Sequence, residues 1–193
     1  MFEGYRFILG SQSPRRRELL AGLCLDFTVE PIKGDPEVYD SSMPREEVPE
    51  FLARYKSSGY PRPLEADEVL ITADTLVYLG DRLMGKPKDR GEAFEMLRSL
   101  SGRTHSVLTG VAVRTASRCE SFTSTTEVTF KELSEEEITY YVDNYRPYDK
   151  AGSYGVQEWI GYIGITGIEG SYFNVMGLPV QRLYTQLREM LCD

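Results

Sequence analysis

The apolar segment Val69–Leu79 constrains the fold of this 193-residue chain more than any other part of its sequence. Its aliphatic and β-branched residues predict a core strand, and Gly80-Asp81 supplies a tight turn into a short returning strand, Arg82–Met84. One ionised carboxylate, Asp74, stands in the middle of this strand, where it is costly unless it is paired or bound to a metal. The segment therefore predicts a core strand that carries an unusual charge.

Strand and helix patterns alternate along the rest of the chain. The expected strands are Arg6–Leu9, Leu25–Pro31, Val69–Leu79, Val107–Val113 and Ser121–Lys131. The expected helices are Arg15–Ala21, Glu46–Ser58, the segment from Asp89 to Gly102, the segment from Ser134 to about Asn144, and the segment from Pro179 onward. The Gly- and Tyr-rich segment Ala151–Gly177 is expected to mix strand and turn. This alternation predicts an α/β class with a mixed twisted sheet flanked by helices. Since no linker is visible, we expect residues 1–193 to form a single domain, with two lobes around a cleft.

Three helix starts carry N-cap signatures. They are Ser13 followed by Pro14, and two expected capping boxes, Asp89 with Glu92 and Ser134 with Glu137. The first of these places a basic run at the opening of a helix.

Composition limits the classes of partner and compartment. The net charge of −8 argues against a general affinity for nucleic acid or for an anionic membrane. The three cysteines, Cys24, Cys119 and Cys192, form no CxxC pair, which suits a reducing compartment and argues against a zinc site. The N-terminal apolar run Phe7–Leu9 is too short for a signal or a membrane span. We therefore expect a cytoplasmic protein that binds neither nucleic acid nor membrane.

The basic run lies within Ser11–Arg17, at the predicted start of the first helix. Three arginines oppose the helix dipole there, at up to roughly 0.3–1 kcal/mol each if they are left unpaired. A bound anion would reverse the sign of each contribution, and backbone donors, hydroxyls and guanidinium groups together would form a phosphate cradle. The alternative is a solvated first turn that pairs with surface carboxylates.

Asp74 also has two interpretations: a metal- or water-binding carboxylate, or a residue at a strand edge or bulge with a local salt bridge. Lys86 follows the predicted hairpin, which could bring its ammonium to the same site; taken alone it is an ordinary surface lysine. The one histidine, His105, has no partner pattern and is expected to be structural. Neither a GxxxxGK[ST] loop nor a GxGxxG sequence occurs. Abundant carboxylates favour a hard metal such as Mg²⁺ or Mn²⁺.

Together these segments resemble the Maf family of nucleotide pyrophosphatases, whose fold is related to inosine triphosphatases. The matching segments are Leu9–Arg16, Leu52–Lys56, Ala73–Thr75, Gly85–Pro87, Leu100–His105, Asp149–Gln157, Ile168–Gly170 and Asn174–Pro179. They occur in the family's order and spacing over almost the whole chain. Three positions depart from the family pattern. Gly10 and Ser57 stand where alanine is usual, and proline at position 36 precedes Glu37, which aligns with the family's acidic site residue.

The resemblance implies hydrolysis of a nucleoside triphosphate to its monophosphate and pyrophosphate, with a divalent metal as cofactor. The implied catalytic residues are Asp74, Lys86 and Glu37, and the implied metal ligands are Asp74 and Glu37. The implied substrate-binding residues are Ser11, Arg15, Arg16, Lys56, Thr75 and Gln157. No covalent intermediate is required.

Thr75 and Gln157 resemble the branch of the family that prefers dTTP and UTP. A carboxamide can accept from uracil N3–H and donate to O4, a pair that cytosine does not mirror. Gln157 as a plain loop amide remains the alternative for this residue. For the protein, the alternatives are a 7-methyl-GTP or inosine-type pyrophosphatase and a non-catalytic nucleotide-binding regulator of cell division. The resemblance further suggests a homodimer.

Overall fold

The computed structural model describes residues 2–32 and 39–192. Two compact units make up the chain: unit 1 comprises Met1–Asp74, Thr109–Ser124 and Gly177–Asp193, and unit 2 comprises Thr75–Leu108 and Thr125–Met176. The strands are β1 (Arg6–Leu9), β2 (Phe27–Val29), β3 (Glu68–Leu79), β4 (Arg82–Leu83), β5 (Thr104–Arg114), β6 (Cys119–Phe130) and β7 (Ile165–Glu169). The helices are α1 (Pro14–Ala21), α2 (Val48–Ser58), α3 (Arg90–Leu100), α4 (Glu135–Tyr145), α5 (Trp159–Gly164), α6 (Tyr172–Met176) and α7 (Val180–Leu191).

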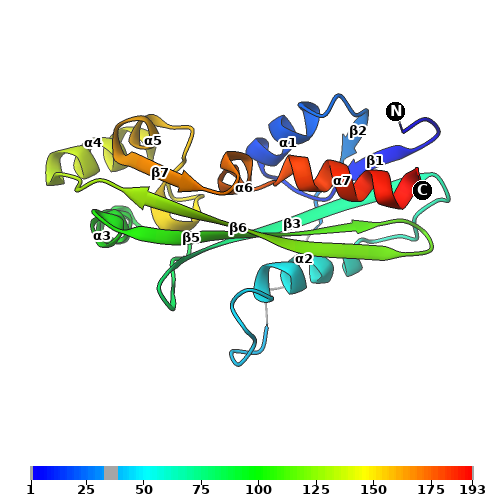
Figure 1. Cartoon of the computed structure of the whole chain (residues 1–193), viewed down its shortest axis with the longest axis horizontal. Helices are drawn as coiled ribbons and strands as arrows, with labels where there is room; N and C mark the ends of the chain where they lie inside the picture. Colours follow the sequence, from blue (N-terminus) through cyan, green and yellow to red (C-terminus); the bar gives the residue numbers. More distant parts are fainter. Residues whose placement is uncertain (1, 33–38, 193) are drawn as a thin grey trace. The chain divides into compact units, whose positions relative to one another are not determined.

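The strands form a mixed sheet, as the alternation of patterns predicted. The order is β2-β1-β3-β5-β6-β7, and β4 pairs with β3. β1 runs parallel to β2 and to β3, whereas β4 is antiparallel to β3 and β7 is antiparallel to β6. The predicted α/β class with helices flanking a mixed sheet is therefore confirmed (Figure 1).

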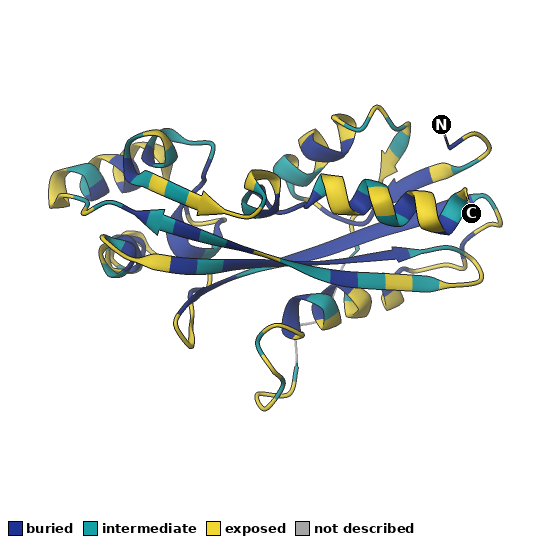
Figure 2. Cartoon of the chain, in the orientation of Figure 1, coloured by how far each residue is buried: buried dark blue, intermediate teal, exposed yellow. Residues whose placement is uncertain are grey.

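The predicted core strand is β3, which is buried along most of its length (Figure 2). Leu70 and Ile71 are fully buried, and they lie in the register where β3 pairs with β1. The pairing with β1 ends at Leu9, opposite Ile71, while β3 continues to Leu79. Asp74 therefore lies beyond the carboxyl end of β1, inside a strand that has neighbours on both sides.

In unit 1, α2 lies on one face of the sheet and α1 and α7 lie on the other (Figure 1). The backbone of α2 comes into direct contact with β5 at Gly110, where a Cβ atom would lie 2.0 Å from the carbonyl oxygen of Pro49. The hydroxyl of Thr72 donates to the carbonyl of Ala53 at 2.7 Å. These two contacts fix the height of α2 above the sheet and so position Lys56 in its last turn.

The predicted N-caps are present in the structure. Ser13 and Asp89 accept from the backbone N–H groups of Arg16 and Glu92, at 3.4 and 2.9 Å. The expected capping box at Asp89 is only half present, because the Glu92 carboxylate accepts from the N–H of Lys88 at 2.7 Å rather than from that of Asp89. Ser134 forms the reciprocal box at the start of α4, where its hydroxyl accepts from the N–H of the glutamate three residues on and its own N–H donates to that carboxylate. Local capping chemistry thus sets the starts of α1, α3 and α4.

The prediction for Ala151–Gly177 was incomplete. Strand β7 is present, but the segment also contains a 3-10 turn at Ala151–Ser153 and the short helices α5 and α6. The sequence did not predict α5 because this helix contains two glycines, and glycine disfavours a helix. Gly161 is required for packing, because a Cβ atom there would lie 1.9 Å from the carbonyl oxygen of Val156.

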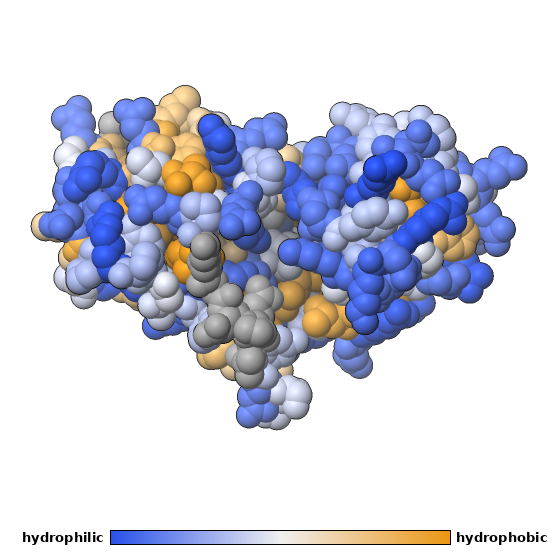
Figure 3. All heavy atoms as spheres, turned by 180° about the vertical axis from the view of Figure 1, so that it is seen from behind, coloured by the Kyte–Doolittle hydropathy of each residue, from blue (hydrophilic) through white to orange (hydrophobic). Residues whose placement is uncertain are grey.

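Among the described residues, no helix combines the length and the apolar character that a membrane span needs. On the face drawn in Figure 3, hydrophilic residues predominate and hydrophobic residues form small separate patches.

Candidate active site

The turn from β1 into α1 places hydroxyl groups and N–H donors at the helix start. The N–H of Gly10 donates to Ile71 at 2.9 Å and so extends the parallel pairing by one residue. The hydroxyl of Ser11 then accepts from the N–H of Ser13 at 3.2 Å, and the hydroxyl of Ser13 caps the helix at Arg16. The chain is thereby bent sharply, and the positive end of the α1 dipole lies next to the end of β1.

Arg16 fills the position that a longer β1 would occupy. In a parallel ladder alternate carbonyls of a strand face the same neighbour, so the carbonyl of Ala73 follows that of Ile71 on the β1 side. Arg16 Nη1 donates to this carbonyl at 2.8 Å, and Nε donates to the carbonyl of Gly177 at 2.9 Å. Nη1 also lies 3.4 Å from the hydroxyl oxygen of Ser11. One guanidinium therefore joins α1, β3 and the segment that leads into α7.

A pocket of about 470 Å³ opens beside the start of α1. Its lining includes Ser11, Ser13, Arg17 and Val29. The volume lies in the range of small-ligand sites. Arg15, predicted to bind phosphate, is partly buried in the first turn of α1. Its role stays a prediction.

The carboxylate of Asp74 pairs with the ammonium of Lys56 in a short hydrogen-bonded contact. Asp74 is 7% exposed and lies in β3 beyond the point where β1 ends, so its burial and its ion pair fit both interpretations, and its role stays a prediction. The lysine comes from 18 positions away, in the last turn of α2, where a cation suits the helix dipole. The backbone contact of Arg16 with Ala73 lies one residue before this pair. Ser11, Arg16, Lys56 and Asp74 are thus linked through a continuous set of contacts within unit 1.

The predicted metal pair is only partly described, because Glu37 lies outside the described residues. Among residues 2–32 and 39–192, no group of three or more His, Cys, Asp or Glu residues is placed to hold a metal ion. Asp74 nevertheless fits a hard cation, since Mg²⁺ is commonly bound through one or two carboxylates together with substrate phosphates and water. Asp74 would supply the anionic oxygen ligand that such an ion prefers.

Three predicted residues belong to unit 2. Thr75 is partly buried in β3, and Lys86 is exposed after the predicted hairpin of β3 and β4. Gln157 is partly buried, and its Oε1 is a buried atom for which the described residues supply no hydrogen-bond partner. The N–H of Gly152 donates to the carbonyl of Gly85, directly before Lys86, at 3.1 Å. Whether Lys86 reaches Asp74 stays a prediction.

His105 takes a structural position, as the sequence predicted. It is 1% exposed, stacks on Phe130 with ring centroids 5.7 Å apart, and shares a 2.7 Å hydrogen bond with the hydroxyl of Tyr154. Burial lowers its pKa to about 4, so the ring is neutral at neutral pH.

Sequence reasoning missed two residues that contact the backbone or side chains around Gln157. These are Tyr141 of α4 and Glu158, which follows Gln157 directly. A buried tyrosine on the apolar face of a helix has the pattern of an ordinary core residue, so the sequence carries no separate signal for it.

The relatives of this chain are close in both sequence and length. A protein named dTTP/UTP pyrophosphatase from Phocaeicola vulgatus is 53% identical over 188 residues, covering 97% of both chains. Proteins of the same name from Bacteroides thetaiotaomicron and Porphyromonas gingivalis are 50% and 51% identical, covering 96% of this chain and 96% and 94% of their own lengths.

The fold likeness extends to a more distant solved structure. A HAM1 protein from Coxiella burnetii superposes with a TM-score of 0.50 at 15% identity, covering 96% of this chain and 99% of that one. This likeness concerns the fold alone and agrees with the predicted inosine triphosphatase-like architecture. The family model described as Maf-like protein matches residues 6–190. The chain belongs to the Maf-like protein family.

Proposed function

We propose that this chain is a nucleoside triphosphate pyrophosphatase that hydrolyses dTTP and UTP to the monophosphate and pyrophosphate. The names and the 50–53% identity of its relatives support this activity. The observation that carries the proposal is the pair of Asp74 and Lys56, held beside the start of α1 by the contacts of Arg16. A buried carboxylate paired with Lys56, with Arg16 bonded to the carbonyl of the preceding residue, supports hydrolysis of a polyanion.

In this proposal the triphosphate is held by basic side chains and by a hydroxyl group. Arg15, Arg16 and Lys56 supply positive charge, and the hydroxyl of Ser11 donates to a phosphate oxygen. The positive end of the α1 dipole adds partial positive charge. Lys86 completes the set as a cation for the departing pyrophosphate.

Asp74 orients the attacking water and accepts its proton. The water oxygen forms a bond to the α-phosphorus, and the bond from that phosphorus to the oxygen bridging to the β-phosphate breaks. The bridging oxygen leaves with its electron pair as part of pyrophosphate. In this step Lys56 turns from Asp74 to a phosphate oxygen, so the carboxylate gains basicity as the substrate is bound.

A divalent metal would be held by Asp74 and, from the family resemblance, by Glu37. Bound there, Mg²⁺ or Mn²⁺ neutralises phosphate charge and activates water. Both ions prefer oxygen ligands, which agrees with the carboxylate on β3.

The base is read by Thr75 and Gln157 of unit 2. The buried Oε1 of Gln157 is an acceptor suited to the N3–H of uracil or thymine, while its Nε2 donates to O4. Cytosine has an acceptor at N3 and a donor at C4, so both contacts would fail. A site with buried polar groups rejects such a base strongly, because its groups are left unpaired.

A pyrophosphate-release assay tests the proposal. The purified chain is given dTTP, UTP, CTP, ITP and 7-methyl-GTP, each with Mg²⁺, with Mn²⁺ and with a chelator. We expect fast release from dTTP and UTP, CTP slower by about 10²-fold, and no turnover with chelator. Fastest release from 7-methyl-GTP or ITP would favour the alternative substrates. Binding of UTP without release would favour a regulator.

Two further expectations accompany this function. The homodimer rests on the family resemblance, and sedimentation of the purified chain tests it. The cytoplasmic location rests on the cysteines, all three of which are free in the described residues, and a fluorescent fusion in cells tests it.

A further inference from the structure

Gln157 lies in a tight turn whose ends are defined. The N–H of Glu158 donates to the carbonyl of Gly155 at 3.0 Å, so residues 155–158 form a closed four-residue turn with Gln157 at its third position. The direction of the Gln157 side chain depends on this turn, because a short turn leaves the backbone few alternatives.

The hydroxyl of Tyr141 contacts both ends of the turn. It donates to Oε2 of Glu158 in a short hydrogen bond, and it accepts from the N–H of Gly155 at 3.0 Å. Tyr141 is fully buried in α4, so water does not compete for either contact. Burial, and then the hydrogen bond to Glu158, raise the pKa of Tyr141, which keeps the hydroxyl protonated and able to donate.

A buried lysine completes a cluster that consists of Tyr141, Lys150, Glu158 and the N–H of Gly155, and it pairs with the Glu158 carboxylate. Lys150 is 8% exposed, and its ammonium lies 3.1 Å from Oε1 of Glu158 and 2.8 Å from Oδ1 of Asp149. Glu158 therefore has one carboxylate oxygen on Tyr141 and the other on Lys150. The Tyr141 bond joins α4 to the loop, and the Lys150 pair lies within the loop.

Glycines allow the cluster to close. A Cβ atom at Gly155 would lie 2.8 Å from the carboxyl carbon of Glu158. At the other end of the same loop, Gly152 has a φ of +71° and donates to the carbonyl groups of Met84 and Gly85, at 3.0 and 3.1 Å. The loop thus joins the segment before Lys86 to the turn that carries Gln157.

We propose that Tyr141 and Glu158 are positioning residues for base recognition: the Tyr141 hydroxyl holds both ends of the Gly155–Glu158 turn and so fixes the direction of the Gln157 carboxamide. This inference rests on the proposed function, since it needs Gln157 to read the base. It assigns selectivity to residues that touch no substrate. A purely structural role would lower stability without changing which base is preferred.

The test compares Tyr141→Phe with Tyr145→Phe. Tyr145 lies one helical turn further along α4, stacks on Tyr141 with ring centroids 5.0 Å apart, and is 39% exposed. Each variant removes one hydroxyl from the same helix, and only the first loses the contacts to the turn. The measurements are kcat and KM for UTP and CTP, and backbone hydrogen exchange of the peptide that covers residues 155–158.

For Tyr141→Phe we expect faster exchange at this turn and a fall of about tenfold in the ratio of kcat/KM for UTP over CTP. The loss should arise mainly from a raised KM for UTP, while Tyr145→Phe keeps both values. An unchanged rate of hydrogen exchange at residues 155–158 in Tyr141→Phe would show that the Tyr141 hydroxyl does not hold the turn. Faster exchange with an unchanged UTP to CTP ratio would refute the positioning role.

The two measurements distinguish a failure of this inference from a failure of the proposed pyrophosphatase function. A wild-type chain that releases no pyrophosphate from UTP overturns the proposed function and the selectivity role together, whereas the exchange data still decide whether Tyr141 holds the turn. If Tyr141→Phe does not fold, Glu158→Gln takes its place, because it keeps the side-chain shape and weakens the bond to Tyr141. The same two changes are expected from it, at about threefold in the ratio, and their absence would overturn the inference.

Discussion

Two buried carboxylates lie on the same strand, and they differ in the kind of partner that neutralises them. Glu68, the first residue of β3, is 3% exposed, and Asp74, six positions further along, is 7% exposed. Two arginines and one backbone N–H contact Glu68, whereas a lysine pairs with Asp74. Burial and charge alone therefore do not distinguish a structural carboxylate from a catalytic candidate.

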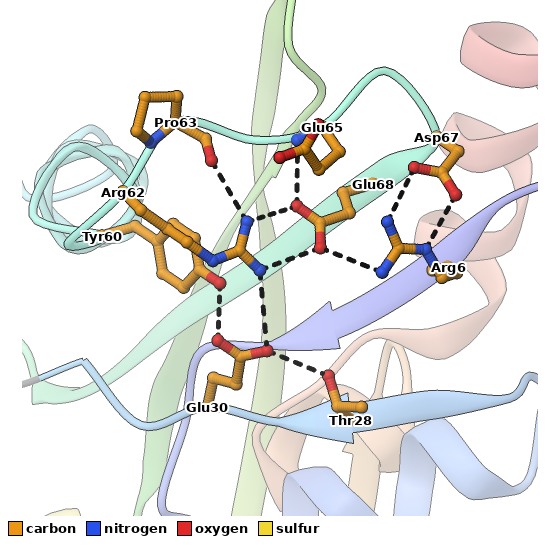
Figure 4. Close-up of polar contacts among 9 residues, drawn as sticks. All are labelled: Arg6, Thr28, Glu30, Tyr60, Arg62, Pro63, Glu65, Asp67 and Glu68. Carbon is orange, nitrogen blue, oxygen red and sulfur yellow. Dashed lines mark hydrogen bonds and ion pairs between the residues drawn. The ribbon is translucent and has the colours of Figure 1, made fainter.

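Glu68 lies at the centre of a fixed network (Figure 4). Arg62 donates to both of its oxygens, at 2.6 and 2.8 Å, and the N–H of Glu65 donates at 2.9 Å. Arg6 adds an ion pair at 3.4 Å. These bonds, with that of Arg62 foremost, lower the pKa of Glu68 to about 2. The planar fork of Arg62 matches the carboxylate geometry, so this pair resists exchange.

The partner of Asp74 has different chemistry. The ammonium of Lys56 is a point charge on a flexible stem, without the fixed two-bond geometry of Arg62, and it can turn to another anion when a new cation takes its place on Asp74. The surroundings differ as well, because Arg16 and the start of α1 lie next to Asp74. The comparison indicates that the kind of cation, rather than the number of cations nearby, separates the two carboxylates.

The largest expected effect comes from Asp74→Asn. The amide keeps the size of the side chain but cannot take a proton from water, so kcat for UTP should fall by about 10³-fold or more. Pyrophosphate release measures the loss, and circular dichroism and a melting curve verify the fold. The matched control is Glu68→Gln, for which we expect kcat to remain within about twofold. Equal losses of activity in both variants would break the comparison.

A smaller effect is expected from Arg16→Lys. A lysine cannot donate to the carbonyl groups of Ala73 and Gly177 in the planar geometry of a guanidinium. The hydrogen bonds that connect the start of α1 to β3 and to the segment before α7 are therefore lost. We expect kcat/KM for UTP to fall by about 10²-fold. The control is Arg6→Lys in the Glu68 network, where the side chain is 61% exposed and pairs with Asp67 at 2.7 Å. Its kcat/KM should change by less than about twofold; a loss as large as that of Arg16→Lys would contradict the assignment.

Much of the fold was predictable because its signals are local. The buried run of β3 and the hydroxyl and carboxylate caps at Ser13, Asp89 and Ser134 gave the right elements in the right order. The helix α6 was not predictable, since it has five residues and depends on a distant partner. Its Asn174 donates to the carbonyl of Val107 and to the hydroxyl oxygen of Thr126, both at 3.0 Å.

The candidate site was predictable only in part. Asp74 stood out as a charge in an apolar strand. Glu68 on the same strand did not stand out, and no sequence pattern indicated its partner Arg62. The choice of Lys56 came from family resemblance, because no spacing rule joins it to Asp74. The contact between Arg16 and Gly177 spans 161 positions, and only a folded chain can supply it.

The smallest expected effect tests whether the charge of Glu68 stabilises the fold. Glu68→Gln removes the charge that faces Arg62, and we expect the melting temperature at neutral pH to fall by about 5 °C. The folded-state pKa of about 2 lies below the ordinary value of 4.5, so the carboxylate stabilises the fold fully above that value and loses its contribution as pH falls toward 2. The gap between wild type and Glu68→Gln should therefore narrow on acidification. Melting curves of both chains at neutral pH, at about pH 4 and at about pH 3 measure it. A gap that stays constant would mean that shape rather than charge makes Glu68 structural.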